Sequence, residues 1–333
     1  MEKGYIIRRI LYTFVIFMVV VTLNFFIPRI GVEDPAERYY PPRLGSTTDE
    51  EYEELKALTR EQYGFDKSVV GQYAEYVNKL LHGDLGNSFL PGRPKVMDLI
   101  LERLPWTLVL SISTMLISAI IGIIYGTYAA VKRGMAADTA LLAASTVATA
   151  VPAFFIALLL SMFLGFKLGW FPPYADPYMA SNFDWSLREI LNVFNNAALP
   201  IISMSIGGII GYALSTRNSV IIVSNEDFIL TAKAKGMSNK RVLYKHTLSN
   251  ALLPIVTRFC MSISGLIGGA VVIEKIFNWS GMGTLFLDAN ANNDYPLMMG
   301  IMLFMSSIAL FANLVADLTY SLLDPRVKGG GRR

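Results

Sequence analysis

The chain has 333 residues, of which 53% are hydrophobic and 17% are charged, and its mean hydropathy is +0.44. Soluble domains carry about 25% charged residues, so this composition excludes a disordered chain and disfavours an ordinary soluble enzyme. The formal net charge of +3 argues against nucleic acid as a partner. A single cysteine, Cys260, excludes an intramolecular disulfide and a multi-cysteine metal site.

Long stretches without ionisable residues mark candidate membrane spans, because a single span is helical and needs about 20 apolar residues. Five such stretches are clear, at 10–28, 104–131, 139–166, 190–216 and 295–316. A sixth, 252–273, contains Arg258, whose side chain can reach the interface by snorkelling. The alternative for the sixth stretch is a re-entrant or interfacial segment. The first stretch is too long for a signal peptide and lacks a cleavage site, which favours a retained helix.

The distribution of Lys and Arg predicts the orientation of these spans, because short cytoplasmic loops are enriched in both. With the N-terminus inside, the short outer loops hold only Lys167, Arg188 and Lys275. The inner positions then hold Lys3, Arg8, Arg9, Lys132, Arg133, Arg217, Lys233, Lys235, Lys240, Arg241 and Lys245, and the tail adds Arg326, Lys328, Arg332 and Arg333. We therefore expect a multi-pass plasma (inner) membrane protein with both termini in the cytoplasm.

The segment 30–104 between the first two spans is expected outside the cell as a helical insert. Residues 49–63 have acidic residues in the first turn and basic residues later, and Gly64 follows, so they predict a surface helix. A second helix is predicted over 68–81, followed by a stretch rich in Gly and Pro turns. The segment is either a solvated cap on the bundle or a docking surface for an extracellular partner.

The inner connection at about 217–250 has clear helix signals. Asn225 is placed to cap a first helix, which Lys233 and Lys235 complete at its negative end, and Gly236 supplies a left-handed residue after it. Ser238 can cap a second helix. The small side chains of Ala232 and Ala234 permit close approach by another protein. The alternative is a basic amphipathic loop lying on anionic lipid.

The sequence at 231–257, TAKAKGMSNKRVLYKHTLSNALLPIVT, resembles the cytoplasmic EAA loop of ABC importer permeases. The version is that of the B-type permease subunit of dipeptide and oligopeptide importers. Seven further blocks resemble that subunit in order: REQYGFDKSVVGQY (60–73), GDLGNSF (83–89), ERLPWTL (102–108), LGWFPP (168–173), VVIEKIFNWSGMG (271–283), NDYPLMMGI (293–301) and DLTYSLLDPRVK (317–328). Ala232 and Gly236 match the EAA signature, whereas Leu230 and Thr231 stand where Glu and the first Ala are expected.

This resemblance implies an all-α membrane protein with six transmembrane helices and the type I ABC importer permease fold. Its parts are then a tail and first helix (1–29), an extracellular segment (30–104) and a five-helix core (105–333). The implied partners are a second homologous permease, two cytoplasmic ATPase subunits and an extracellular substrate-binding protein. The residues implied to contact an ATPase are Phe228, Thr231, Ala232, Lys233, Ala234, Lys235, Gly236, Met237 and Arg241.

The chain contains no G-x-x-x-x-G-K-[ST] motif, so it lacks a loop that could cradle a triphosphate. We therefore expect no bound cofactor and no enzymatic activity in this chain, with ATP and Mg²⁺ on partner subunits. The spans also lack an ionisable residue near their centres, which argues against a secondary carrier or channel. With only His82, His246 and Cys260 of their types, a membrane-bound enzyme is the weakest alternative.

Hydroxyl and amide side chains within the spans could line a polar path for substrate. The candidates are Ser203, Ser262, Ser264 and Asn313, although such groups often bond only to their own helix. Peptides are the first expectation for the substrate, and oligosaccharides, nickel chelates and glutathione are alternatives. The glycine pairs 122/126, 207/211 and 265/269 predict close helix packing or, alternatively, a sliding gate surface.

Overall fold

The computed structural model describes residues 3–30, 36–40, 43, 48–175, 186–264 and 270–323. Within these ranges every element is helical, apart from one isolated β-bridge between Asn87 and Lys95. The chain divides into two compact units. Unit 1 comprises Met1–Ile10, Arg103–Thr284 and Ile308–Arg333, and unit 2 comprises Leu11–Glu102 and Leu285–Ser307.

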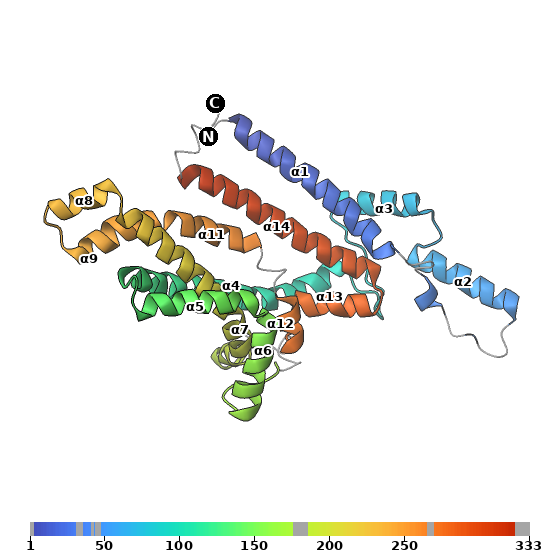
Figure 1. Cartoon of the computed structure of the whole chain (residues 1–333). Helices are drawn as coiled ribbons and strands as arrows, with labels where there is room; N and C mark the ends of the chain where they lie inside the picture. The colour runs from blue at the N-terminus through green and yellow to red at the C-terminus, as the bar shows by residue number, and fades with distance from the viewer. Residues whose placement is uncertain are drawn as a thin grey trace. The chain divides into compact units, whose positions relative to one another are not determined.

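The helices follow one another along the chain as drawn in Figure 1. The first half holds α1 (Lys3–Phe26), η1 (Ile27–Arg29), η2 (Glu37–Tyr39), α2 (Asp49–Tyr63), α3 (Val69–Leu81), α4 (Val96–Val131), α5 (Ala136–Ala150), α6 (Ala153–Leu160) and η3 (Ser161–Lys167). The second half holds α7 (Leu187–Ser224), α8 (Asp227–Ala234), α9 (Asn239–Arg241), η4 (Val242–Leu248), α10 (Ser249–Ala251), α11 (Leu253–Ser264), α12 (Val271–Ile276), α13 (Met282–Ala291) and α14 (Tyr295–Leu323).

Four stretches of helix are long and apolar enough to cross a membrane: Ile6–Arg29, Val96–Val131, Leu187–Ser224 and Tyr295–Val315. They coincide with four of the five clear spans expected from the sequence. The stretch expected as a sixth span begins as α11, which has 12 residues and ends at Ser264. Residues 265–269 lie outside the described part of the chain, so the sixth span stays a prediction.

The remaining clear span expected from the sequence, 139–166, is not an uninterrupted helix. It is a pair, α5 followed by α6 and η3, bent by 101° at the break. Val151 and Pro152 at that break both have extended backbone conformations. Proline cannot donate a backbone hydrogen bond and disfavours a helical residue before it, which explains why the helix stops there. A stretch without charged residues predicts a membrane span but cannot reveal a bend within it.

Close approach of backbones packs α4 against α7 in unit 1. A Cβ atom on Gly122 would lie within 3 Å of Tyr212, and one on Gly126 would overlap Ala213. This confirms close packing for the glycine pair 122/126. In α7, Gly208 meets Ser118, whereas no atom lies within 4 Å of the Cβ position of Gly207. Of the pair 207/211, Gly211 lies at a close approach, with its Cβ position 2.7 Å from Nη2 of Arg258, whereas Gly207 does not. The pair 265/269 lies outside the described residues.

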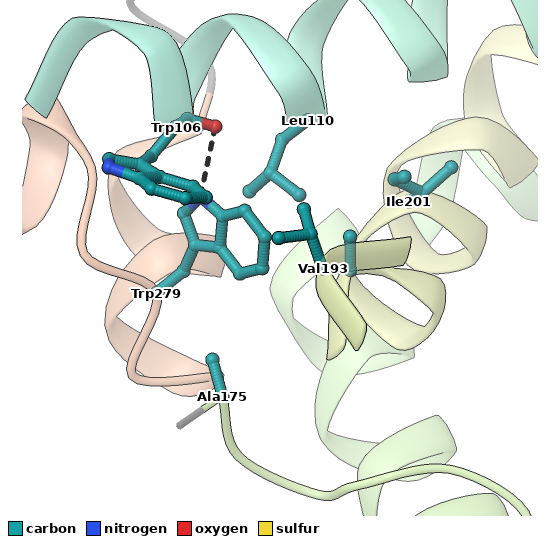
Figure 2. Close-up of a cluster of buried hydrophobic side chains, with 7 residues drawn as sticks. Trp106, Leu110, Ala175, Val193, Ile201 and Trp279 are labelled. Carbon is teal, nitrogen blue, oxygen red and sulfur yellow. Dashed lines mark hydrogen bonds between the residues drawn. The ribbon is translucent and has the colours of Figure 1, made fainter. Parts of the chain in front are cut away.

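Two tryptophans form the centre of a buried cluster in unit 1 (Figure 2). Trp279 is fully buried, its ring meets that of Trp106 edge to face, and its indole N–H donates to the Trp106 carbonyl oxygen at 2.9 Å. Leu110, Val193 and Ile201 complete the apolar surroundings. The cluster fixes the segment after α12 against the N-terminal halves of α4 and α7.

A buried carboxylate reinforces this arrangement. Glu274 of α12 is fully buried and accepts hydrogen bonds from the Thr107 hydroxyl and the Gly283 amide, both at 2.7 Å, and from the Thr284 amide at 3.2 Å. The Met282 amide in turn donates to the Thr107 hydroxyl at 2.7 Å. One carboxylate thereby satisfies backbone donors at the start of α13 that no helical carbonyl can reach. Sequence reasoning placed Glu274 only within a family block.

Unit 2 contains the two helices expected in the insert. Helix α2 spans Asp49–Tyr63 as predicted, with a capping box between Thr48 and Glu51 and a left-handed Gly64 after it. Helix α3 spans Val69–Leu81, and the Ser68 side chain caps it. The following loop is held by buried Asp294, which accepts hydrogen bonds from the Ser88 hydroxyl at 2.5 Å and the Phe89 amide at 2.9 Å.

Candidate functional site

The connection after α7 forms a bent pair of helices, here called the elbow (residues 225–250). Helix α7 continues to Ser224, and Asn225 stands at its C-terminal end with its side-chain amide donating to the Ile221 carbonyl at 3.1 Å. The predicted N-cap role of Asn225 is therefore wrong. Glu226 takes the N-cap position of α8 without a side-chain capping bond. An amide side chain can close the preceding helix as readily as open the next one, which the sequence pattern does not distinguish.

Gly236 makes the turn of the elbow, as predicted. Its φ of +76° lies in the left-handed region that L side chains rarely adopt, and it follows the last turn of α8. Ser238 is the N-cap of α9, again as predicted, although no side-chain capping bond forms. Figure 1 shows α8 and α9 beside each other, joined by this turn.

The elbow has a small apolar core of its own. Ile229 and Ala232 of α8 pack against Val242 of η4, and Met237 packs against this cluster. Ile229 is 1% exposed and Ala232 is 4% exposed. Ala232 therefore faces the inside of the elbow, which corrects the expectation that it offers a small outer surface to a partner. Because α8 has only eight residues, this core is what keeps it folded.

The outer surface of α8 combines apolar and basic side chains. Phe228 is 44% exposed and Leu230 is 57% exposed, and Thr231, Ala234 and Lys235 are exposed beside them. Of the remaining predicted contact residues, Lys233, Gly236 and Arg241 are exposed and Met237 is half-buried. Exposed apolar side chains beside basic ones suit a contact with another protein or with anionic lipid.

The base of the elbow is fixed to the helical bundle. Ala130 at the end of α4, Val220 of α7 and Ala251 of α10 form a buried cluster, against which Leu243 and Leu248 of η4 pack. A hollow of about 360 Å³ lies under the elbow, with Ile229, Lys233 and Thr247 among the residues that line it. The packing of Leu243 and Leu248 thus connects the elbow to the ends of α4 and α7.

An ion pair that sequence reasoning missed joins α7 to α5 close to the elbow. Arg217 donates to both oxygens of Asp138, from Nε at 2.8 Å and from Nη2 at 2.9 Å. Asp138 is buried and also accepts the Gly134 amide at 2.9 Å. A bidentate pair of this kind fixes geometry as well as adding energy. Its signals in the sequence are an acid immediately before the charge-free stretch 139–166 and a base immediately after the charge-free stretch 190–216.

Two of the residues proposed for a substrate path, Ser203 and Ser262, hydrogen-bond to carbonyls of their own helices. Ser203 is buried and donates to the Leu199 carbonyl of its own helix at 2.6 Å. Ser262 bonds to the Tyr212 hydroxyl at 3.0 Å and to the Arg258 carbonyl of its own helix at 2.9 Å. Asn313 is exposed on α14, and the side chain of Ser264 lies outside the described residues. The path stays a prediction.

Comparison with known protein families shows which family this chain belongs to. Residues 122–329 match the model of the binding-protein-dependent transport system inner membrane component, and residues 3–111 match the model of its N-terminal part. The chain belongs to this family. It is accordingly a multi-pass membrane protein and a permease component of a transport system, which agrees with the apolar helices described above.

Relatives align along nearly the whole chain. The oligopeptide transport system permease protein AppB of Bacillus subtilis is 33% identical over 98% of this chain and 99% of its own length. The di/tripeptide transport system permease protein DppB of Pseudomonas aeruginosa is 32% identical over 98% of each chain. The oligopeptide transport system permease protein OppB of Haemophilus influenzae is 30% identical over 97% of this chain and 99% of its own.

Proposed function

We propose that this chain is the permease subunit of an ATP-driven importer of peptides and that the elbow couples it to a cytoplasmic ATPase. The single observation that carries the coupling role is the construction of the elbow. It is a short helix with an internal core, a left-handed turn and exposed Phe228 and Leu230, fixed at its base to α4 and α7. The chain has no triphosphate-binding loop, so the energy source is a separate subunit.

The rest of the assembly follows from this role. A second homologous permease completes the path, two ATPase subunits bind from the cytoplasm, and an extracellular binding protein delivers the substrate. The sixth span is the stretch that begins as α11, both termini are cytoplasmic, and the insert 30–104 is extracellular. The printed names of the relatives support peptides as the substrate.

Transport by the reconstituted system tests this function. The complete assembly in proteoliposomes is expected to take up a labelled dipeptide or oligopeptide only when binding protein outside and ATP inside are both present. Peptide uptake without ATP would contradict the ATP-driven mechanism. Uptake of an oligosaccharide, a nickel chelate or glutathione in place of peptides would leave the machinery intact and overturn the substrate assignment.

A further inference from the structure

A cavity of about 220 Å³ in unit 2 lies where two membrane-crossing stretches end. Phe25 and Arg29, in the last turns of the stretch Ile6–Arg29, form part of its wall. Tyr295 and Met299, in the first turn of the stretch Tyr295–Val315, form another part. Because the ends of membrane spans lie at the level of the lipid headgroups, the cavity lies at that level too.

Arg29, one of the cations that line this cavity, has unused hydrogen-bonding capacity. Its two hydrogen bonds both leave from Nη1, to the Phe25 carbonyl at 2.7 Å and to the Met299 sulfur at 3.2 Å. The guanidinium carbon lies 3.8 Å from the centre of the Phe25 ring and 5.7 Å from that of Tyr295. Its Nε is buried without a hydrogen-bond partner, and among the described residues no carboxylate pairs with Arg29.

The free edge of the guanidinium, Nε and Nη2, has the geometry of a bidentate donor to an oxyanion. A buried donor without an acceptor is costly, so this edge marks the position of a missing acceptor. The aromatic walls hold the guanidinium in place and supply apolar contact beside it.

The other charged groups of the cavity are compatible with an anion at Arg29. Lys79 and Arg93 also line it, together with Glu75 and Asp84. Glu75 is already paired with Lys67 at 2.7 Å and Lys79 at 2.8 Å, and Asp84 accepts the Gly86 amide at 2.8 Å. Both acids therefore already have donors of their own, and neither of them pairs with Arg29.

We propose that this cavity binds the phosphodiester of a membrane phospholipid, with the Nε and Nη2 edge of Arg29 donating to two phosphate oxygens. The phosphate group is the shared chemistry of a lipid headgroup and of free phosphate. The position at the ends of two spans selects the lipid, whose acyl chains can lie along the exposed apolar side chains of α1, such as Leu23.

Native mass spectrometry of the full-length chain in a phosphate-free maltoside detergent tests this proposal. The probe is a short-chain phosphatidylglycerol, with diacylglycerol and inorganic phosphate as comparisons. Wild type is expected to retain one tightly bound phospholipid, with about tenfold or greater loss of affinity in Arg29→Gln. Arg29→Lys, which keeps the charge without the fork, is expected to fall between them. The matched control is Arg43→Gln, an exposed arginine of the same unit that pairs with Asp49 outside the cavity.

Each outcome decides the matter. Equal phospholipid retention by wild type and Arg29→Gln, or an equal loss in Arg43→Gln, would overturn the site. Diacylglycerol bound as tightly as phosphatidylglycerol would show that the phosphate is not recognised. Inorganic phosphate that displaces the lipid at equal concentration would overturn the lipid as the ligand. Should Arg29→Gln fail to fold, the ranking of Arg29→Lys against wild type carries the test.

Discussion

Single buried carboxylates hold segments of this chain together that lie far apart in sequence. Glu274 connects α12 to Thr107 of α4 and to the first amides of α13. Gly281 is required beside it, because a Cβ atom there would overlap the carboxylate. The hydrogen bonds of this carboxylate therefore fix the conformation of the segment between α12 and α13.

Replacing Glu274 by Gln puts an amide N–H₂ group among donors that need an acceptor. We expect Glu274→Gln to destabilise the protein by about 2 kcal/mol, visible as a lower thermal unfolding midpoint of the detergent-solubilised chain. Gly281→Ala should act in the same direction, and Glu50→Gln, at an exposed position, should have little effect. An unchanged midpoint in Glu274→Gln would show that the hydrogen bonds of the carboxylate are not needed for stability.

The pair between Arg217 and Asp138 can be tested by exchanging its charges. Asp138→Asn and Arg217→Gln each leave one partner uncompensated, so both should lower the unfolding midpoint and ATP-driven uptake. The double variant Asp138→Arg with Arg217→Asp should recover part of both losses, because the ion pair is restored in reverse. If the double variant is as impaired as the sum of the single ones, the two side chains are not coupled.

Glu75 gives the segment 30–104 a dependence on pH. Hydrogen bonds from Lys67 and Lys79 lower the pKa of Glu75 from its ordinary value of about 4.3 to about 2. Since the folded pKa is depressed, its contribution to stability is complete above about pH 4.5 and is lost as the pH falls towards 2. The side chain is 39% exposed, so solvent limits this contribution to less than about 1 kcal/mol.

Hydrogen exchange of α3, corrected for intrinsic rates, measures this effect. Wild type should lose protection between pH 4.5 and pH 2.5, whereas Glu75→Gln should show reduced protection at pH 6 and little further loss. The control is Glu54→Gln, another exposed acid of the segment 30–104. Identical pH profiles for wild type and Glu75→Gln would rule out the ion pairs as the source.

At the scale of helices, local sequence signals predict the bounds of a helix where residues at its own ends determine them. The acidic first turn of α2 and Gly64 after it predict its bounds, and Gly236 predicts the turn of the elbow. Bonds between distant segments could not be predicted in this way. Thr107 and Glu274 are 167 residues apart, and no periodicity relates them. The bend at Pro152 and the inward side of Ala232 likewise depend on three-dimensional packing.

The elbow's turn can be altered at one residue. Gly236→Pro removes a backbone donor, whose bond to the Lys233 carbonyl is 2.9 Å long, and forbids a positive φ. We expect peptide uptake to fall at least tenfold while ATP hydrolysis by the assembly continues. Gly236→Asn, which tolerates the left-handed region, should retain most uptake.

Gly134 provides a matched control for backbone strain. Its φ of +77° and its open surroundings resemble those of Gly236, but it lies between α4 and α5. Gly134→Asn and Gly236→Asn should therefore cost similar stability, and neither should separate hydrolysis from uptake. Uptake at the wild-type rate in Gly236→Pro would contradict the role of the turn.

At the scale of the whole molecule, the chain combines apolar helices long enough to cross a membrane with the elbow. The family relationship explains the apolar helices, because members of this family are inner membrane components of transport systems. The small core of Ile229, Ala232 and Val242 gives the elbow a shape that can be recognised from outside. The buried cluster of Ala130, Val220 and Ala251 connects the elbow to α4 and α7.

Site-specific cross-linking of the elbow tests the central claim most directly. In a Cys260→Ser background, Phe228→Cys is compared with Leu81→Cys, an 80% exposed position at the end of α3 in the segment 30–104. In intact membranes, a short bifunctional reagent should join Phe228→Cys to the ATPase subunit and should leave Leu81→Cys without that product. An ATPase adduct at Leu81→Cys, or none at Phe228→Cys in a transport-competent assembly, would contradict the account.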